Sequence, residues 1–313
     1  MMDTGNTGHL IRSEVWSSQL KEVLEDELMG QGYVNWMSEF PDGTSFTIPS
    51  IGQAQTDDYT ENASVQYRAL DTGQFQFTIG KYKSSGNYIT NKAKQDAYYM
   101  NQLVSSFVPK QARAIMETLE TDIMALSAKQ TASNSNSVNG AEHRFVGTGT
   151  NEVIAVADFA KARYALKKAN FPDRNLIAIV DPSVEYAMNT LTNITNVSNN
   201  PRWEGIITSG IASGMSFLAN IYGFDVYTSN YLADANEQID SAGPTTAAGK
   251  ANMFFSADPS VLPFIGAWRQ MPQVDSEYNK DYQREEYVTT ARYGVDLYRP
   301  ENLVCVLTDT DQV

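Results

Sequence analysis

Residues 101–128 read NQLVSSFVPKQARAIMETLETDIMALSA, and they carry the strongest helical pattern in this chain of 313 residues. Apolar side chains recur there at intervals of three and four residues, which places them on one stripe of an α-helix. The stripe begins one residue earlier and comprises Met100, Leu103, Val104, Phe107, Val108, Ala112, Ile115, Met116, Leu119, Ile123 and Leu126. At 1.5 Å per residue, the quoted stretch would form a helix about 40 Å long. The sequence therefore predicts one long amphipathic helix as the dominant element of the fold.

Pro109 interrupts this helical pattern, which extends over residues 91–130. A proline inside a helix removes one backbone hydrogen bond and costs about 3 kcal/mol. Either the helix is kinked at Pro109, or a new helix begins there with the proline in its first turn. We expect the kink.

The residues before the helix form short runs in which apolar and polar side chains alternate, a pattern typical of strands. The strand-like runs are 46–48, 65–70 and 75–79, with turn-forming residues at 71–73. Residues 53–62 are almost wholly polar. An isolated two-stranded hairpin with so little apolar surface is marginally stable in water. We therefore expect residues 46–90 to form an extended hairpin that lies on another surface.

Residues 1–45 are expected to form an acidic arm with one short helix. They carry eight acidic and two basic side chains. The helix would span residues 13–29, with Ser13 as its N-cap and two glycines, Gly30 and Gly32, beyond its end. The first eight residues are polar, so no secretory signal peptide is expected.

The chain beyond the long helix alternates between expected helices and strands. A loop rich in Ser and Asn at residues 131–140 marks the best internal boundary. Helices are expected at 156–170 and 182–191, strands at 176–180, 224–228, 251–255, 287–291, 294–298 and 303–307, and loops at 193–201 and 234–250. This pattern indicates α/β material followed by a β-rich end.

The net charge of −14 argues against a protein that grips nucleic acid, because neutralising phosphates needs clustered Lys and Arg. The acidic excess lies toward the ends of the chain. Residues 181–313 hold seventeen acidic and seven basic side chains, whereas residues 91–180 hold eleven basic and eight acidic ones. The apolar runs are too short to cross a bilayer. The single cysteine, Cys305, lies in an apolar run and is expected to be a buried strand residue.

Residues suited to catalysis or metal binding are few. The two histidines, His9 and His143, are not spaced against another His or Cys as zinc ligands are, and we expect both in exposed loops. Acidic pairs occur, but 37 acidic residues produce such pairs by chance. The pairs are Asp57-Asp58, Glu285-Glu286 and Asp309-x-Asp311. We therefore expect no catalytic site, no bound metal and no cofactor.

Several short motifs follow one another along nearly the whole chain. They are Phe46-Thr47-Ile48-Pro49, Asp58 to Asn62, Phe75 to Ile79, Ile89-Thr90 before the long helix, Ile177 to Pro182 with Tyr186, Tyr222 to Asn230, and Gln283 to Pro300. In this order they resemble the major capsid proteins of tailed bacteriophages with the Hong Kong 97-type fold, especially those of short-tailed phages. The resemblance implies an α+β fold with an N-terminal arm, an extended loop, a peripheral domain with a spine helix, and an α/β axial domain. The corresponding ranges are 1–45 for the arm, 46–90 for the extended loop, 91–155 for the peripheral domain, 156–265 for the axial domain, and 266–313 for strands that return to the peripheral domain.

The resemblance also implies a function without catalysis. The subunit would assemble through pentamers and hexamers into an icosahedral shell around a phage genome, in the cytoplasm of a host bacterium. Its partners would be other copies of itself, a separate scaffolding protein and a portal, with only weak, non-specific contact to packaged DNA and no contact with membrane. The candidates for contacts between subunits lie in the extended hairpin and are Tyr59, Glu61, Val65, Tyr67, Leu70, Phe75 and Phe77.

Two other interpretations remain open from the sequence. An encapsulin-type shell, which encloses a cargo enzyme, shares this fold, although the acidic arm differs from the short amphipathic start of such proteins. A hydrolase that uses a carboxylate pair in a tyrosine-lined groove is the alternative from another class. It would act as a monomer or small oligomer.

Overall fold

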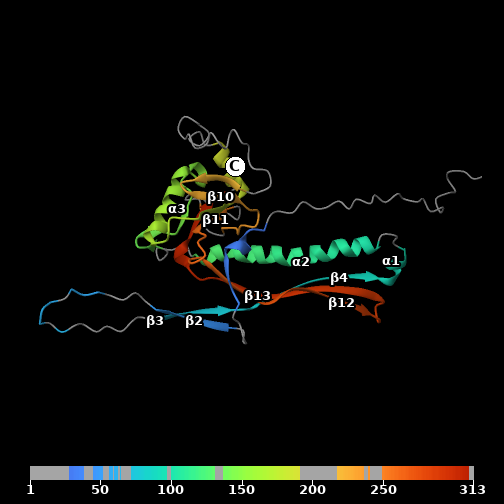
Figure 1. The fold of residues 1–313 in the computed structure, drawn as a ribbon. Coiled ribbons are helices and arrows are strands. Elements are labelled where there is room, and N and C mark those ends of the chain that lie inside the picture. Colours follow the sequence, from blue (N-terminus) through green and yellow to red (C-terminus); the bar gives the residue numbers. More distant parts are fainter. Residues whose placement is uncertain are drawn as a thin grey trace, which may run out of the picture.

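The computed structural model describes the body of the chain and parts of its projecting hairpin (Figure 1). The described residues are 28–38, 45–51, 56–58, 60–62, 64, 72–96, 100–130, 137–190, 217–235, 239 and 249–309. The helix expected at residues 13–29 and the strand expected at 65–70 lie almost wholly or wholly outside them.

A six-stranded sheet forms the centre of the α/β part. Its strand order is β7-β14-β11-β8-β10-β9. The bounds are β7 Arg144–Val146, β14 Leu303–Thr308, β11 Lys250–Ser256, β8 Leu176–Val180, β10 Phe224–Thr228 and β9 Phe217–Ile221. The pairs β8/β10 and β7/β14 are parallel, and the other pairs are antiparallel. The expected strands at 176–180, 224–228, 251–255 and 303–307 are therefore confirmed.

The middle strands of this sheet bury side chains on both faces, because their sequences are apolar without interruption. Ala178, Phe254 and Val304 point into a core that also contains helices α3 (Val156–Lys168) and α4 (Pro182–Thr190). Their neighbours Ile179, Phe255 and Cys305 point into a second core on the opposite face. The expected burial of Cys305 is confirmed, and this sheet separates two cores that share no side chain.

The second core joins the six-stranded sheet to a four-stranded sheet with the order β1-β12-β13-β4. The bounds are β1 Val34–Met37, β12 Phe264–Asn279, β13 Arg284–Leu297 and β4 Lys81–Thr90. Helix α2, Met100–Met124, runs beside β4, β12 and β13 (Figure 1). The short helix α1, Asn91–Asp96, precedes it, and the 3-10 helix η2, Ala125–Lys129, continues it. Leu119, Ile123 and Leu126 are buried as the apolar stripe predicts.

Polar contacts supplement the apolar packing of α2 on the sheet. Thr289 Oγ1 donates to Gln111 Oε1 at 3.1 Å, and both side chains are buried. The Asp122 carboxylate accepts from Tyr293 Oη at 2.7 Å and pairs with Lys81 Nζ at 2.7 Å. Burial and this contact with Asp122 raise the pKa of the Tyr293 hydroxyl. These contacts fix the helix along its axis, because each one requires one particular register.

Pro109 lies inside helix α2, so the alternative in which a second helix begins at this proline is excluded, and the kink stays a prediction.

Two expectations about local structure need correction. The strands expected at 287–291 and 294–298 are parts of one long strand, β13, since pairing on both sides carries it through Arg292 and Tyr293. Thr72 and Gly73 open strand β3, Thr72–Thr78, and pair with Ile51 and Ser50, so the expected turn at 71–73 is wrong there.

Three strands of the four-stranded sheet were missed, because their polar residues do not alternate clearly with apolar ones. They are β1, β4 and β12.

The range 266–313, which was expected to return as one group of strands, divides between the two sheets, with β13 in one and β14 in the other. Burial explains the position of β14, whose residues are all buried and so require a covered place in the six-stranded sheet.

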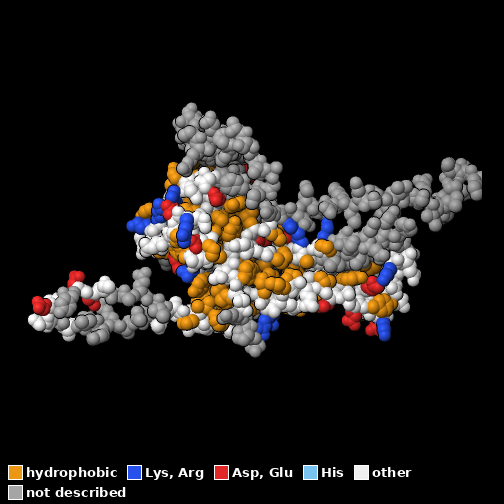
Figure 2. Space-filling model, viewed as in Figure 1, with side chains coloured by type: hydrophobic (Ala, Val, Ile, Leu, Met, Phe, Trp, Pro, Cys, Tyr) orange, Lys and Arg blue, Asp and Glu red, His pale blue; other side chains and the backbone are white. Residues whose placement is uncertain are grey.

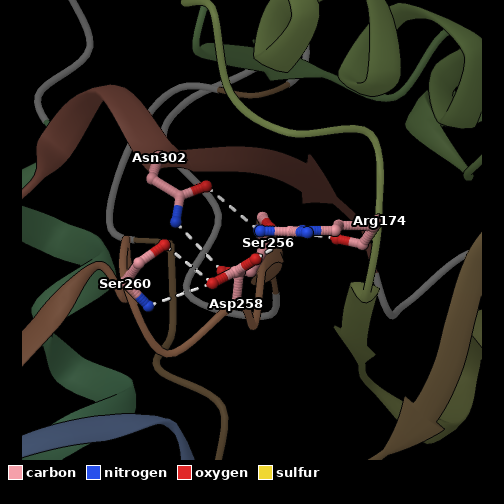
Figure 3. Close-up of polar contacts among 5 residues, drawn as sticks. All are labelled: Arg174, Ser256, Asp258, Ser260 and Asn302. Carbon is pink, nitrogen blue, oxygen red and sulfur yellow. Dashed lines mark hydrogen bonds and ion pairs between the residues drawn. The ribbon is translucent and has the colours of Figure 1, made fainter.

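Two crossovers, residues 257–263 and 298–302, connect the sheets and are held together by a polar network (Figure 3). Pro263 O accepts from the backbone N–H groups of Tyr298 and Arg299. Asn302, fully buried, accepts from Ser256 N at 3.0 Å and donates to Ser256 O at 3.0 Å and Val261 O at 2.6 Å.

Asp258 closes the outer side of the same network. Its carboxylate accepts from Ser260 N at 3.0 Å, Ser260 Oγ at 2.7 Å and Arg174 Nε at 2.6 Å (Figure 3). The two hydrogen bonds from Ser260 and the contact with Arg174 lower the pKa of Asp258. The long β12–β13 hairpin therefore leaves and re-enters the six-stranded sheet through one ordered junction.

We predict that Asn302→Ala lowers the free energy of unfolding by about 3 kcal/mol, because two buried backbone groups of Ser256 and the partly buried Val261 O lose their partner. Urea denaturation of the purified chain measures this change. The control Asn87→Ala, at an exposed position of β4, should change stability by less than about 0.5 kcal/mol. Equal stability of the two variants would contradict the role of Asn302.

Candidate functional site

The hairpin formed by β2, Ser45–Ile51, and β3 projects from the body of the subunit (Figure 1). The two strands pair antiparallel from Ser45 and Thr78 to Ile51 and Thr72. We call residues 45–78 the arm. The described residues beyond the paired strands, which include Asp57, Asp58 and Glu61, are exposed, and Figure 2 shows acidic side chains toward the arm's end. The described residues between the paired strands therefore present polar and acidic groups.

The base of the arm is anchored by apolar packing. Phe77 and Ile79 are buried and form a small core with Ile265 and Ala267 of β12. Phe75 packs edge to face on Tyr298, with ring centroids 5.2 Å apart. In the view of Figure 2, hydrophobic side chains gather where the arm joins the body. The arm is thus fixed at one end and exposed at the other.

Gly294 of β13 permits the close approach of the arm's base. A Cβ atom at this position would lie 2.7 Å from Thr78 O and 3.0 Å from the Ile79 Cα. Any larger residue would push the end of β3 away from β13. This glycine is a structural requirement of the arm that sequence reasoning did not identify.

The seven predicted contact residues fall into three groups. Tyr59, Val65, Tyr67 and Leu70 lie outside the described residues. Glu61 is exposed near the far end of the arm, and Phe75 is partly buried at its base. Phe77 is fully buried within the subunit, so its side chain belongs to the internal core. Phe75 and Phe77 belong to one apolar cluster at the base of the arm. Glu61 is not part of this cluster.

A second exposed surface is the face of the four-stranded sheet opposite α2. Thr289, Ala291 and Tyr293 point toward the helix side and are buried, so the alternate residues of β13 point to the other face. On that face Tyr82 and Tyr88 of β4 are each 61% exposed. Large apolar surfaces that remain exposed in a subunit commonly mark contacts with other proteins.

The far end of this sheet carries an aromatic and cationic cluster. The Arg284 guanidinium lies 4.5 Å from the ring centroid of Tyr88 and 4.7 Å from that of Tyr282, and its Nε donates to Glu286 Oε1 at 2.6 Å. Strand β4 is the edge strand beside it. An edge strand offers backbone donors and acceptors that another chain can pair with.

The acidic pair Glu285-Glu286 does not form paired carboxylates. Glu285 and Glu286 are adjacent in β13 and therefore point to opposite faces. Glu285 forms an ion pair with Lys94, and Glu286 pairs with Arg284. The hydrogen bonds from Lys94 and Tyr287 lower the pKa of Glu285. Both carboxylates thus take part in structural ion pairs, which does not favour the hydrolase interpretation.

His143 was expected in an exposed loop, and this expectation is wrong. Its ring is fully buried, and each ring nitrogen lies 3.1 Å from a backbone carbonyl oxygen, Nδ1 from Ala141 and Nε2 from Glu301. The adjacent polar residues suggested a loop, but β6, Ala141–Glu142, and β7 flank the histidine in sequence, and its ring packs against the backbone of Glu301. His9 lies outside the described residues.

Within the described part of the chain, no group of three or more His, Cys, Asp or Glu side chains is arranged to hold a metal ion. No helix there is long and apolar enough to cross a membrane.

The buried polar residues that matter most for the architecture, Asn302, Gln111 and Glu120, were not identified from the sequence. Their only signal is a polar residue within a buried apolar segment, and one sequence does not show which segments become buried.

Solved structures of phage capsids resemble this chain over nearly its whole length. Residues 74–306 match a family model described as phage capsid protein. A search of curated proteins finds no match. Similar solved structures include one titled capsid structure of the cyanophage P-SCSP1u, with a TM-score of 0.73 and 14% identity, covering 94% of this chain and 91% of that one. A structure of Mycobacterium phage Che8 has a TM-score of 0.68 and 15% identity, covering 94% and 96% of the two chains. The capsid of a native GTA particle has a TM-score of 0.67 and 10% identity, covering 97% of each chain.

We predict that Phe77→Ala lowers the free energy of unfolding by about 3–5 kcal/mol, because it leaves a cavity at the base of the arm. Glu61→Ala should leave stability within about 0.5 kcal/mol of the wild type, because its side chain is exposed. Thermal and urea unfolding of the two variants measure this difference. A stable Phe77→Ala variant would show that the arm is not anchored by this core.

Proposed function

Because this chain belongs to the phage capsid protein family, we propose that its subunits assemble through pentamers and hexamers into a closed shell that encloses a phage genome. The family match covers most of the chain, including α2, strands β4, β12 and β13 of the four-stranded sheet, and the six-stranded sheet up to Val306 in β14. It is the observation that carries the function. The chain is a major capsid protein and a component of an icosahedral shell.

The expected α+β Hong Kong 97-type fold is confirmed by the similarity of the whole subunit to solved phage capsid subunits. The match extends over more than nine-tenths of this chain in each of those structures. Because these structures have low sequence identity to this chain, the similarity shows the fold alone. Contacts between subunits of this protein are therefore proposed from its own surfaces.

The arm is the first of these surfaces. It has an apolar base within the subunit and exposed polar residues beyond, so little of the subunit's own core depends on its far part. We assign contacts with a neighbouring subunit to Tyr59, Glu61, Val65, Tyr67 and Leu70, with Phe75 at the inner limit. Phe77 supports these contacts indirectly, by holding the base of the arm.

The division into parts follows the same reasoning. Residues 1–45 would be an N-terminal arm, which is distinct from the arm at residues 45–78. Residues 46–90 would be the extended loop, although β4, at the end of this second range, pairs with β13. Residues 91–155 would form the peripheral domain around the spine helix, and residues 156–265 the axial domain. Residues 266–313 would return to the peripheral domain through β12 and β13, whereas β14 joins the six-stranded sheet.

The remaining partners follow from the chemistry of a shell subunit. A separate scaffolding protein and a portal would direct assembly in the host cytoplasm. Contact with packaged DNA would be weak and non-specific, because a chain of net charge −14 gains little from phosphate attraction. The family match supports this interpretation over a cargo-enclosing compartment and over a hydrolase, and it points to a structural role without catalysis.

We predict that the purified chain forms pentamers, hexamers or closed shells, because its arm and exposed sheet face are left uncovered in the single subunit. Sedimentation and negative-stain microscopy over a range of concentrations measure this. A thermally stable monomer at every concentration would contradict the proposal.

We further predict that replacing residues 53–70 by a short Gly-Ser linker leaves the subunit folded but prevents closed shells. The replacement retains β2, β3 and the core around Phe77, so intramolecular stability should change little. Contacts from the removed segment would be repeated at every copy, and many weak contacts together decide whether a shell closes. Circular dichroism and thermal melting measure folding, and microscopy measures assembly.

The matched control replaces residues 131–136, a Ser- and Asn-rich stretch of sequence outside residues 45–78, by a Gly-Ser linker of equal length. Shells should form from this control. Normal shells from the arm variant would refute the role of the arm. An unfolded arm variant would show that residues 53–70 belong to the subunit's own core.

A further inference from the structure

Helix α3 presents a basic face to solvent. The cations on this face lie opposite the side of α3 that packs into the core shared with α4, and they are Lys161, Arg163, Lys167 and Lys168. The structure describes every residue of α3, and none on the exposed face is acidic, because Asp158, its one acidic residue, is buried. In the view of Figure 2, Lys and Arg side chains gather over α3. The helix therefore directs four cationic side chains away from the core.

Nearby carboxylates neutralise this face only in part. Two carboxylates pair with three of the four cations, as Lys161–Glu142 at 2.8 Å, Arg163–Asp173 at 2.6 Å and Lys167–Asp173 at 2.8 Å. The hydrogen bonds from Arg163 and Lys167 lower the pKa of Asp173 to about 2. Lys168 forms no ion pair within the described part of the chain, and its Nζ lies 5.9 Å from the ring centroid of Tyr164. The face thus keeps an excess of positive charge, and its surface ion pairs are weak enough to rearrange around a ligand.

A strained tyrosine stands beside this face. Tyr222 and Gly223 form the two-residue turn between β9 and β10, with φ angles of 50° and 88°. Such a turn favours Asn, Asp or Gly at its first position, and a bulky residue with positive φ is strained there. Tyr222 is 50% exposed, and its backbone oxygen accepts from Arg163 Nη1 at 2.8 Å. Backbone strain is concentrated at functional positions, so the exposed hydroxyl of Tyr222 is a candidate for a contact outside the subunit.

The chemistry of this surface fits the phosphate groups of nucleic acid. Lys, Arg and Tyr side chains all bind phosphate oxygens, whereas Lys is depleted in contacts between proteins. The chain as a whole has a net charge of −14 and repels phosphate. A contact with DNA therefore needs a face on which positive charge is in excess, and α3 provides such a face.

We propose that the exposed face of α3, together with Tyr222, is the surface by which the subunit contacts the phosphate backbone of packaged duplex DNA, so that α3 faces the interior of the shell. This inference rests on the proposed shell function, which supplies the DNA. Contacts of this kind go to phosphates and read no base sequence. Each one is weak because few charges take part, and the many copies in a shell add them together.

The binding test uses the full chain and a short, fluorescently labelled DNA duplex. Fluorescence anisotropy measures the affinity over a series of salt concentrations. In the double variant Lys167→Gln/Lys168→Gln, the affinity at low salt should fall by about tenfold, and the slope of log affinity against log salt should become shallower by about two, because two phosphate contacts are lost.

The matched control is Lys92→Gln/Lys280→Gln, which removes two exposed lysines outside α3. The control should keep the slope of the parent chain. Equal slopes in the α3 variant and the control would overturn the proposal. A parent chain that binds no duplex at low salt would overturn it too.

A substitution of Tyr222 separates loss of binding from loss of folding. Asn adopts positive φ more readily than Tyr, so Tyr222→Asn should melt at the same temperature as the parent chain or higher. Its affinity for the duplex should nevertheless fall by about two- to fivefold, because one hydrogen bond to phosphate is lost. Unchanged affinity in this variant would overturn the part assigned to Tyr222.

Assembly without DNA distinguishes this inference from the proposed function. The α3 variant should form closed shells in negative-stain microscopy, because the lost charges contact DNA and not another subunit. Shells from the parent chain but not from an α3 variant with an unchanged melting temperature would assign the face to a neighbouring subunit and overturn the proposal. A parent chain that forms no shells, but whose duplex binding depends on α3, would refute the proposed function and leave the DNA contact standing.

Discussion

The central strands β8, β11 and β14 are apolar on both faces, and the need to cover both faces determines how the rest of the chain is arranged. Helices α3 and α4 cover one face. On the other face, α2 packs together with the inner ends of β12 and β13. A two-layer subunit could not satisfy these strands, because one of their apolar faces would remain in water. The long helix and the four-stranded sheet are thus joined to the α/β part by the second core rather than by a flexible linker.

Buried polar residues determine the register of this assembly. Apolar packing is non-directional, so it would allow a helix to slide along the sheet by a turn. The contact of Gln111 with Thr289, and the carboxylate of Glu120 that accepts from the backbone of Gly30 at 2.7 Å, are satisfied in one position only. Asn302 does the same for the two crossovers. Each of these groups is costly to bury unless it is hydrogen-bonded, and the cost discriminates against other arrangements.

A shell subunit must keep some of its surface available for contacts with neighbouring subunits. In this chain we propose that the surfaces for such contacts lie away from the two cores: in the far part of the arm, on the exposed face of β4 and β13, and around Arg284 at the far end of that sheet. The arm is held at its base by Phe77 and Ile79, which pack on Ile265 and Ala267 of β12. These surfaces are suited to many repeated contacts, each weak, as the assembly of a capsid protein requires.

The sequence by itself determined the long helix and the central strands, because their signals are local: the three- and four-residue spacing through Leu119 and Ile123, and the continuous apolar runs at Leu176–Val180 and Leu303–Thr308. It also contained motifs whose order resembled the correct fold family. Only the tertiary structure decided that His143 is buried, that Phe77 faces the subunit's own core, and that β4 and β12 are strands at all. Strands such as β4 are held mainly by backbone hydrogen bonds to a distant partner, and side-chain patterns do not encode that pairing. The burial of a polar residue likewise depends on which segments fold over it, and that is set by contacts between residues far apart in the chain.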